Sequence, residues 1–102
     1  DFVYRELDRV RVKGKDKPVG IFEPVCAQGE EPAGLLEELA LYQVALRLYR
    51  EQEWLQAEEK FGQLRALYPH RYLYQVYAKR VTYLRETPPG PDWDGSFTFT
   101  TK

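Results

Sequence analysis

A run of basic residues near the start of the chain offers the clearest candidate for binding chemistry. Lys13 ends the alternating segment 9–13 and is followed by Gly14. A lysine ammonium group is a compact point charge on a long, flexible side chain, so it can bind an anion. The ordinary alternative is a solvated strand lysine, which residue type alone favours. Residues 14–17 lack the spacing of a phosphate-cradling P-loop, so Lys13 has no neighbouring phosphate ligand in the sequence.

The other reactive side chains do not form a catalytic or metal-binding set. Asp92 and Asp94, followed by Gly95, resemble the opening of a calcium loop, but no glutamate follows downstream. His70 has no serine or cysteine at an informative spacing, so we expect a surface or capping role. Cys26 is the only cysteine, which excludes an internal disulfide, and one thiol with one histidine makes no zinc site. We expect Cys26 to be a small apolar side chain near a linker, and no catalytic residue, metal or cofactor in this chain.

Basic and aromatic residues occur together in the last helical stretch of the sequence. Its cations are Arg71, Lys79, Arg80 and Arg85, and its tyrosines are Tyr72, Tyr74, Tyr77 and Tyr83. Such a combination can bind single-stranded nucleic acid. Four charges are few, however, and the tyrosines are spread around the helix. We therefore expect a packed helix with a solvated basic face and no nucleic-acid partner.

The composition is that of one small domain. The chain has 102 residues, 15% of them aromatic, and a formal net charge of −1. The aromatic content is too high for disorder throughout, and the charge excludes bulk polyelectrolyte binding. No apolar run approaches the roughly 18 residues of a membrane span and no signal peptide opens the chain, so we expect no direct membrane contact. The sequence has no methionine, even at position 1, which suggests a piece of a longer protein.

The elements that must position Lys13 are predicted by periodicity. Polar and apolar residues alternate over residues 9–13, which predicts a strand. Residues 14–18 supply a turn, and residues 19–22 resume an apolar, β-branched run. These segments predict a β-hairpin with a loop of about four or five residues. Because an isolated hairpin is only marginally stable in water, another surface must cover its apolar side chains.

Three stretches with helical periodicity follow a polar linker. The first starts near residue 34, the second runs from Trp54 to Tyr68 and stops at Pro69, and the third runs from His70 to about Arg85. Apolar residues spaced three and four apart predict one buried face on each helix. The predicted faces are Leu35, Leu36, Leu39, Leu41, Val44, Ala45 and Leu48; then Ala57, Phe61, Leu64 and Leu67; then Leu73, Val76, Tyr77, Val81 and Leu84.

The first two helical stretches resemble a tetratricopeptide unit, a helix–turn–helix repeat of 34 residues. The match spans residues 38–71, with Ala57 at the small-residue position and Phe61 at the aromatic one. Ala45 and Gln52 stand where the unit usually carries glycine, the second of them in the turn. Because a lone repeat cannot bury its face, we expect the third helix to cap it.

The tail alternates aromatic residues with threonines. Phe97 and Phe99 follow this pattern, which predicts a strand over residues 96–100. Together with Trp93 these side chains are too apolar to stay in solvent without cost. We expect the tail to fold back onto the hairpin or the helices, with an added strand as one way to do so.

The N-terminal segment, residues 2–23, resembles the end of the catalytic domain of class III nucleotide cyclases. In that family a strand with the pattern Leu-Asp-x-Val-x-Val-Lys-Gly turns and returns as Pro-Val-x-Ile-aromatic-Glu. The chain matches it from Leu7-Asp8 through Val12-Lys13-Gly14 to Pro18-Val19 and Phe22-Glu23. The helical stretches and the ending 88–101 also look like the C-terminal extension of some membrane-anchored bacterial cyclases.

The resemblance implies a parent enzyme that converts ATP to cyclic AMP and pyrophosphate. The family uses Mg²⁺ or Mn²⁺ held by two carboxylates, and an Asn/Arg pair, all of which lie upstream of this segment. The lysine of the Val-Lys-Gly motif binds the terminal phosphates and matches Lys13. The implied partners are ATP, the rest of the catalytic domain and a second cyclase chain in a dimer. The implied location is cytoplasmic, at the cytoplasmic end of a membrane-anchored parent.

These observations predict an α+β chain that is mainly α. Its expected parts are a terminal β-hairpin of the cyclase domain (1–25), a linker (26–33), a tetratricopeptide-like three-helix module (34–86) and a Pro/Gly tail with a short strand (87–102). The expected role is a structural or regulatory module that follows the catalytic core and is inactive alone. The alternative is a free-standing, tetratricopeptide-like protein-interaction module whose groove binds a peptide.

Overall fold

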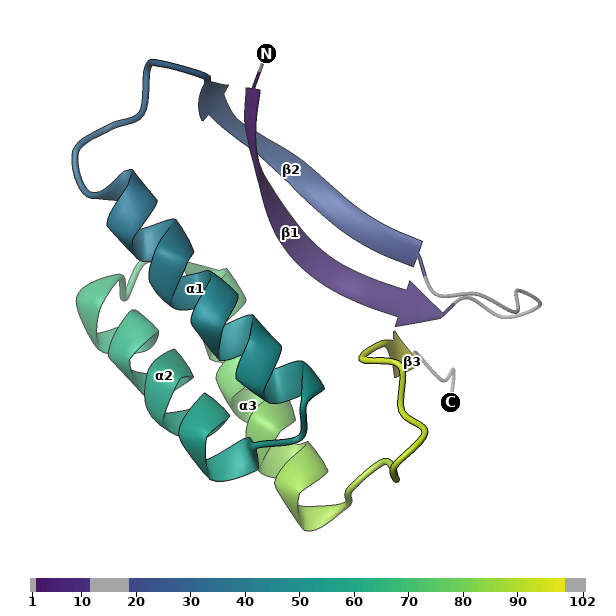
Figure 1. Cartoon of the computed structure of the whole chain (residues 1–102). Coiled ribbons are helices and arrows are strands. Elements are labelled where there is room, and N and C mark those ends of the chain that lie inside the picture. Colours follow the sequence, from purple (N-terminus) through teal and green to yellow (C-terminus); the bar gives the residue numbers. More distant parts are fainter. Residues whose placement is uncertain (1, 12–18, 99–102) are drawn as a thin grey trace. The chain divides into compact units, whose positions relative to one another are not determined.

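The computed structural model describes residues 2–11 and 19–98 of the chain (Figure 1). Its elements, in order, are β1 (Phe2–Arg11), β2 (Val19–Ala27), α1 (Leu35–Arg50), α2 (Trp54–Leu67), α3 (Tyr72–Glu86) and β3 (Phe97–Thr98). The expected fold class, α+β and mainly α with an N-terminal hairpin, three helices and a short C-terminal strand, is confirmed. The chain divides into two compact units, residues 1–33 with 93–102 and residues 34–92. None of the helices in the described ranges is long and apolar enough to cross a membrane.

The hairpin of the first unit is longer than the alternating pattern predicts. β1 and β2 pair antiparallel from Phe2 opposite Ala27 to Val10 opposite Val19. Pairing therefore starts well before residue 9 and continues past residue 22, and the added segments contain the β-branched or aromatic residues Phe2, Val3, Tyr4 and Val25. The predicted loop at 14–18 lies outside the described residues.

The pairing of β1 with β2 has two irregularities, one of them beside a proline. The register shifts between Val3 and Tyr4 and again between Glu6 and Asp8. The first shift lies opposite Pro24, which cannot donate a backbone hydrogen bond. The sheet order β2-β1-β3 leaves β2 at an edge, where a proline is tolerated, as it is at bulges. Cys26 therefore lies in a strand, where the sequence suggested the beginning of a linker.

The tail returns to the hairpin as a third strand. β3 pairs parallel with β1, with Val10 opposite Phe97 and Arg11 opposite Thr98. The expectation that the tail folds back and adds a strand is confirmed, although the described strand covers two residues and the pattern predicted five. Phe99 lies outside the described residues.

The helical unit is held together by a core of aromatic rings. α2 packs against both α1 and α3 (Figure 1). Ala57, Phe61 and Leu64 are fully buried, as predicted, whereas Leu67 is 62% exposed. Phe61 stacks on Tyr77 with 5.1 Å between ring centroids and 7° between the planes. Ala57 carries only a methyl group, which lets α2 approach its neighbours closely.

The predicted apolar face of α1 is only partly correct, because Leu35 and Ala45 are buried as predicted and its other members are not. Leu36 is 59% exposed, and the other predicted leucines after Leu35 are half-buried. The buried face consists of Leu35, Glu38, Tyr42, Ala45, Leu46 and Tyr49. The predicted face omitted Tyr42 and Tyr49. Tyrosine suits such positions because its ring buries a large area while its hydroxyl finds a polar partner. The same reason applies to α3, where Tyr74 is fully buried and the predicted Leu73 and Val76 are only half-buried.

The turn between α1 and α2 is built around Gln52. This residue has a φ of 63°, in the left-handed region that glycine adopts most readily. The sequence placed Gln52 where the tetratricopeptide unit usually carries glycine, and the backbone shows why glycine suits the position. The glutamine side chain makes a contact that glycine could not, because its Nε2 donates to the carbonyl oxygen of Gly90 at 2.6 Å.

Candidate functional site

The strand that leads to Lys13 is described, but Lys13 itself is not. β1 ends at Arg11 and the description resumes at Val19. Lys13 therefore lies outside the described residues, and its role as a phosphate ligand stays a prediction. The described part of the site consists of the strands that flank it and the tail that pairs with β1.

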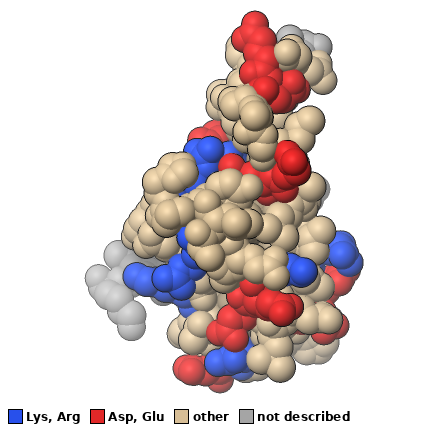
Figure 2. Space-filling view, turned by 90° about the vertical axis from the view of Figure 1, so that its left-hand side faces the viewer, with Lys and Arg blue, Asp and Glu red and all other residues tan. Residues whose placement is uncertain are grey.

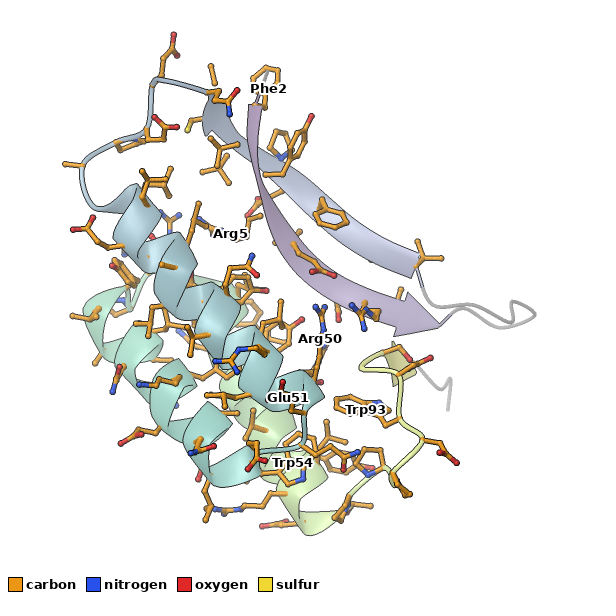
Figure 3. The ribbon with its side chains drawn as sticks, in the orientation of Figure 1. Phe2, Arg5, Arg50, Glu51, Trp54 and Trp93 are labelled. Carbon is orange, nitrogen blue, oxygen red and sulfur yellow. The ribbon has the colours of Figure 1, made fainter. Side chains whose placement is uncertain are left out.

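Four residues form a polar cluster at the end of β1, which we call the tail clip: Arg9, Trp93, Asp94 and Ser96. Nη1 of Arg9 donates to the carbonyl oxygen of Asp94 at 2.7 Å. The Asp94 carboxylate accepts from the backbone N–H and the hydroxyl of Ser96, at 2.9 and 2.5 Å. Nε1 of Trp93, labelled in Figure 3, donates to the carbonyl oxygen of Ser96 at 2.7 Å. These bonds fix the segment that enters β3 and hold it beside β1.

The tail clip gives a structural role to Asp94, one of the two aspartates that resemble the opening of a calcium loop. One oxygen of Asp94 is occupied by Ser96, in the manner of a side chain that caps its own turn. Gly95, between them, has a φ of 85°, in the left-handed region that glycine adopts readily. In the described part of the chain no group of three or more His, Cys, Asp and Glu side chains is placed to hold a metal ion.

One face of the hairpin presents apolar side chains to solvent. Directly paired residues project to the same face of a sheet, and the pairs include Tyr4 with Pro24 and Glu6 with Phe22. Phe2, Tyr4 and Phe22 are 56%, 57% and 57% exposed, and Phe2 is labelled in Figure 3. We call Phe2, Tyr4, Phe22 and Pro24 the hairpin face. Exposed aromatic groups at this density are unusual unless another surface covers them.

The opposite face of the hairpin carries a cross-strand ion pair. Arg5 lies opposite Glu23 in the register, and Nη1 of Arg5 is 3.5 Å from Oε1 of Glu23. Arg5 is 4% exposed and Glu23 is 42% exposed, so the pair is only partly shielded from water. Glu23 is the last residue of the cyclase-like motif, and its partner Arg5 was not identified from the sequence.

The helical unit contains a buried carboxylate that the sequence did not reveal. Glu38 in the first turn of α1 is 2% exposed. Its Oε2 accepts from the Tyr74 hydroxyl at 2.5 Å and from Nε of Arg71 at 2.9 Å. Arg71 and Tyr74 are three residues apart at the start of α3, a spacing that puts both on one side of a helix. That spacing is the signal that could have identified the partners.

His70 and Cys26 are the two remaining residues with reactive side chains. His70 is exposed in the turn between α2 and α3, in agreement with the expected surface role. Cys26 is partly exposed in β2. Burial, together with the carboxylates of Glu31 and Glu30, raises the pKa of its thiol. A raised pKa keeps the sulfur protonated, which makes it a poor nucleophile.

The four cations assigned to a solvated basic face of α3 have separate roles. Arg71 pairs with Glu38, and Arg85 pairs with Glu58 at 2.9 Å. The guanidinium of Arg80 lies over the Tyr77 ring, 5.1 Å from its centroid. Lys79 remains at the surface. Acidic and basic side chains are interspersed over the face drawn in Figure 2, so the charges there do not form a continuous stripe.

Lys79 lies at the edge of a surface hollow between α2 and α3. The hollow has a volume of about 370 Å³. Its lining residues are Glu58, Gly62, Arg65, Ala78, Lys79 and Thr82. We refer to it as the α2–α3 hollow. All six residues belong to the helical unit.

The described residues thus supply a strand that leads to Lys13, a clip that holds the tail against this strand, and a separate hollow on the helical unit. Comparison of the chain with protein-family models, with curated proteins and with solved structures gives no match.

Proposed function

We propose that this chain is the C-terminal part of a class III adenylate cyclase and serves there as a structural or regulatory module. The parent would convert ATP to cyclic AMP and pyrophosphate with Mg²⁺ or Mn²⁺ bound upstream. In this proposal Lys13 binds the terminal phosphates of ATP. The chain would lie in the cytoplasm, behind the catalytic core of a membrane-anchored parent.

The observation that carries the proposal is the pairing of the two halves of the cyclase-like motif. Asp8 in the first half lies opposite Ile21 in the second half, and Val10 lies opposite Val19. The described residues of the motif are therefore neighbours across a hairpin, as the strand–turn–strand pattern requires. This pairing supports the proposal.

The hairpin face gives a second line of support. Phe2, Tyr4 and Phe22 are each more than half exposed. Burying a phenylalanine or a comparable side chain contributes about 1.5–3 kcal/mol, so these residues would favour association with the rest of a catalytic domain. In the proposal this domain is the first partner of the chain, and a second cyclase chain is the other.

The tail clip suggests what the module does for the core. β3 pairs with Val10 and Arg11, and Lys13 is two residues further along the sequence. A strand whose end is held by the tail loses conformational freedom, which favours one position for the residues that follow. We assign to the tail the role of positioning the end of β1.

A substitution of Lys13 in the full-length parent tests the proposal. Loss of one charge-assisted phosphate contact costs about 1.5–3 kcal/mol, so Lys13→Ala should lower kcat/KM about ten- to a hundredfold. Lys15→Ala, which removes the same charge outside the motif, is the matched control and should leave kcat/KM within about threefold. Equal values for wild type and Lys13→Ala would refute the phosphate role.

The isolated chain provides an independent test. Because the metal carboxylates and the Asn/Arg pair are absent from the proposed segment, incubation with ATP and Mn²⁺ should give no cyclic AMP above a blank. Cyclic AMP formed by the pure 102-residue chain would show that the assignment of the catalytic groups to upstream sequence is wrong.

A further inference from the structure

The residues that line the α2–α3 hollow carry an excess of positive charge. Arg65 lines it from α2 and Lys79 from α3. Its one carboxylate, that of Glu58, is already engaged by Arg85, whose Nη1 lies 2.9 Å from Oε1. The Thr82 hydroxyl also lies 3.3 Å from Oε2 of Glu58. Arg65 and Lys79 therefore give the hollow two positive charges in excess, one on each wall.

Neither cation has an acidic neighbour on its own helix. A helical side chain meets the residues three and four positions away. Around Arg65 these are Phe61, Gly62, Tyr68 and Pro69, and around Lys79 they are Gln75, Val76, Thr82 and Tyr83. Among the residues that the structure describes, Arg65 and Lys79 also form no ion pair with another element. Both charges are available to a ligand.

The shape of the hollow limits the size of that ligand. Gly62 and Ala78 give it small side chains between the two cations, and a Cβ built on Gly62 would meet no atom within 4 Å. The volume of about 370 Å³ is at the low end of the roughly 300–1,000 Å³ of ligand pockets. On α2 the lining residues extend from Glu58 to Arg65, which corresponds to about two turns, or roughly 10 Å along the helix axis. That length matches about three residues of extended chain.

We propose that the α2–α3 hollow binds a short, extended acidic segment of another protein. One carboxylate of the segment pairs with the Arg65 guanidinium, which can bind it through two hydrogen bonds. A second carboxylate, two residues along and therefore on the same face of the extended segment, pairs with the Lys79 ammonium group. The aliphatic parts of the two acidic side chains then lie over Gly62 and Ala78. A polyanion such as nucleic acid fits less well, because its affinity comes from many phosphate contacts along a longer basic surface.

This inference goes beyond the cyclase proposal and does not depend on it. All residues of the hollow lie in the helical unit, whereas the cyclase-like motif lies in the hairpin unit. The substitutions below leave the hairpin and the tail clip unchanged.

The test is a titration of a fluorescein-labelled hexapeptide in which glutamate and leucine alternate, capped at both ends, with the full 102-residue chain. Fluorescence anisotropy should show saturable binding that weakens as salt rises. The double variant Arg65→Gln/Lys79→Gln should lower the affinity about tenfold or more. Gly62→Leu should abolish binding by filling the hollow. It should remain folded because a side chain at Gly62 has open space, which circular dichroism and the thermal midpoint will check.

A second double variant separates a specific site from general attraction. Arg47→Gln/Lys60→Gln removes the same two charges outside the hollow and should leave the affinity within about twofold. An equal loss in both double variants would overturn the proposal, as would unchanged affinity in Gly62→Leu or no saturable binding. Tighter binding to a single-stranded oligonucleotide or to phosphatidylserine vesicles than to the peptide would also overturn it. None of these results bears on kcat/KM of the Lys13 variants.

Discussion

Replacing Glu38 by alanine tests whether a buried carboxylate anchors α3 to α1. Glu38 is 2% exposed and accepts a 2.5 Å hydrogen bond from Tyr74, which is fully buried. Loss of this charge-assisted bond costs about 1.5–3 kcal/mol. The Arg71 side chain is 37% exposed and stays partly solvated, so its ion pair contributes at most about 1 kcal/mol. We expect Glu38→Ala to lower the free energy of unfolding by about 2–4 kcal/mol.

The assay is urea and thermal unfolding followed by circular dichroism at 222 nm, a wavelength that reports the helices. A loss of this size should lower the thermal midpoint by about 10 °C or more for a chain of this length. Glu37→Ala is the matched control, because Glu37 is exposed in the same first turn of α1. It experiences the same helix dipole and should cost no more than about 1 kcal/mol.

A double-mutant cycle with Tyr74→Phe isolates the contact between the two side chains. The coupling energy should exceed about 1 kcal/mol, since the residues share one short hydrogen bond. A Glu38→Ala variant no less stable than Glu37→Ala, or a coupling energy near zero, would refute the view that this carboxylate anchors the helices.

Substitutions at three further positions test the packing of the helical unit. Ala57→Leu should destabilise it by about 1–3 kcal/mol through overpacking, because Ala57 is fully buried; an unaltered thermal midpoint would contradict the helix register. Burial first, and then the neighbouring tyrosines, raises the pKa of the Tyr42 hydroxyl above its ordinary value. Above pH of about 10 the unfolded chain loses this proton while the folded chain keeps it, so stability should fall by about 1.4 kcal/mol per pH unit. Tyr42→Phe removes this titrating group. In urea unfolding experiments from pH 9 to 11, the free energy of unfolding of the variant should therefore fall less steeply with pH, by the contribution of one proton. Gln52→Ala and Gln52→Gly both lose the hydrogen bond to Gly90. Alanine still bears the cost of the left-handed backbone at this position, whereas glycine adopts that backbone readily. The glycine variant should therefore be about 1 kcal/mol more stable than the alanine variant, and equal stabilities in urea would show that the backbone of this turn is unstrained.

The helices were predictable from local signals, and the face that α1 buries was not. Pro69 and the polar residues at 51–53 mark helix ends that the structure places within a few residues. The apolar pattern identified Leu35 and Ala45 but missed the rest of the buried face, because burial in this core depends on tyrosines from different helices. Tyr42 contacts Tyr74 and Tyr77 at centroid distances of 5.5 and 6.1 Å. Such contacts depend on tertiary structure, which periodicity within one helix does not encode.

The polar clusters were less predictable for a similar reason. Glu38 looks like an ordinary first-turn acid, and only its contacts with Arg71 and Tyr74, 33 and 36 residues later, explain its burial. The tail clip joins Arg9 to Asp94, and the sequence predicted an added strand without indicating these partners. The candidate site itself rests on a motif, because Lys13 lies outside the described residues and a lysine carries no spacing signal of its own.

The pairing of β1 with β3 can form only after almost the whole chain has been synthesised at the ribosome. Arg9 and its hydrogen-bond partner Asp94 are 85 positions apart. At about 5–20 residues per second, β1 would emerge roughly 4–17 s before the residues that complete its sheet. During that interval the hairpin exposes a strand edge that can pair with other chains. The helices, whose contacts join neighbouring segments, can fold in the same interval. Nascent chains arrested before residue 93 should therefore recruit chaperones through the hairpin and not through the helical unit.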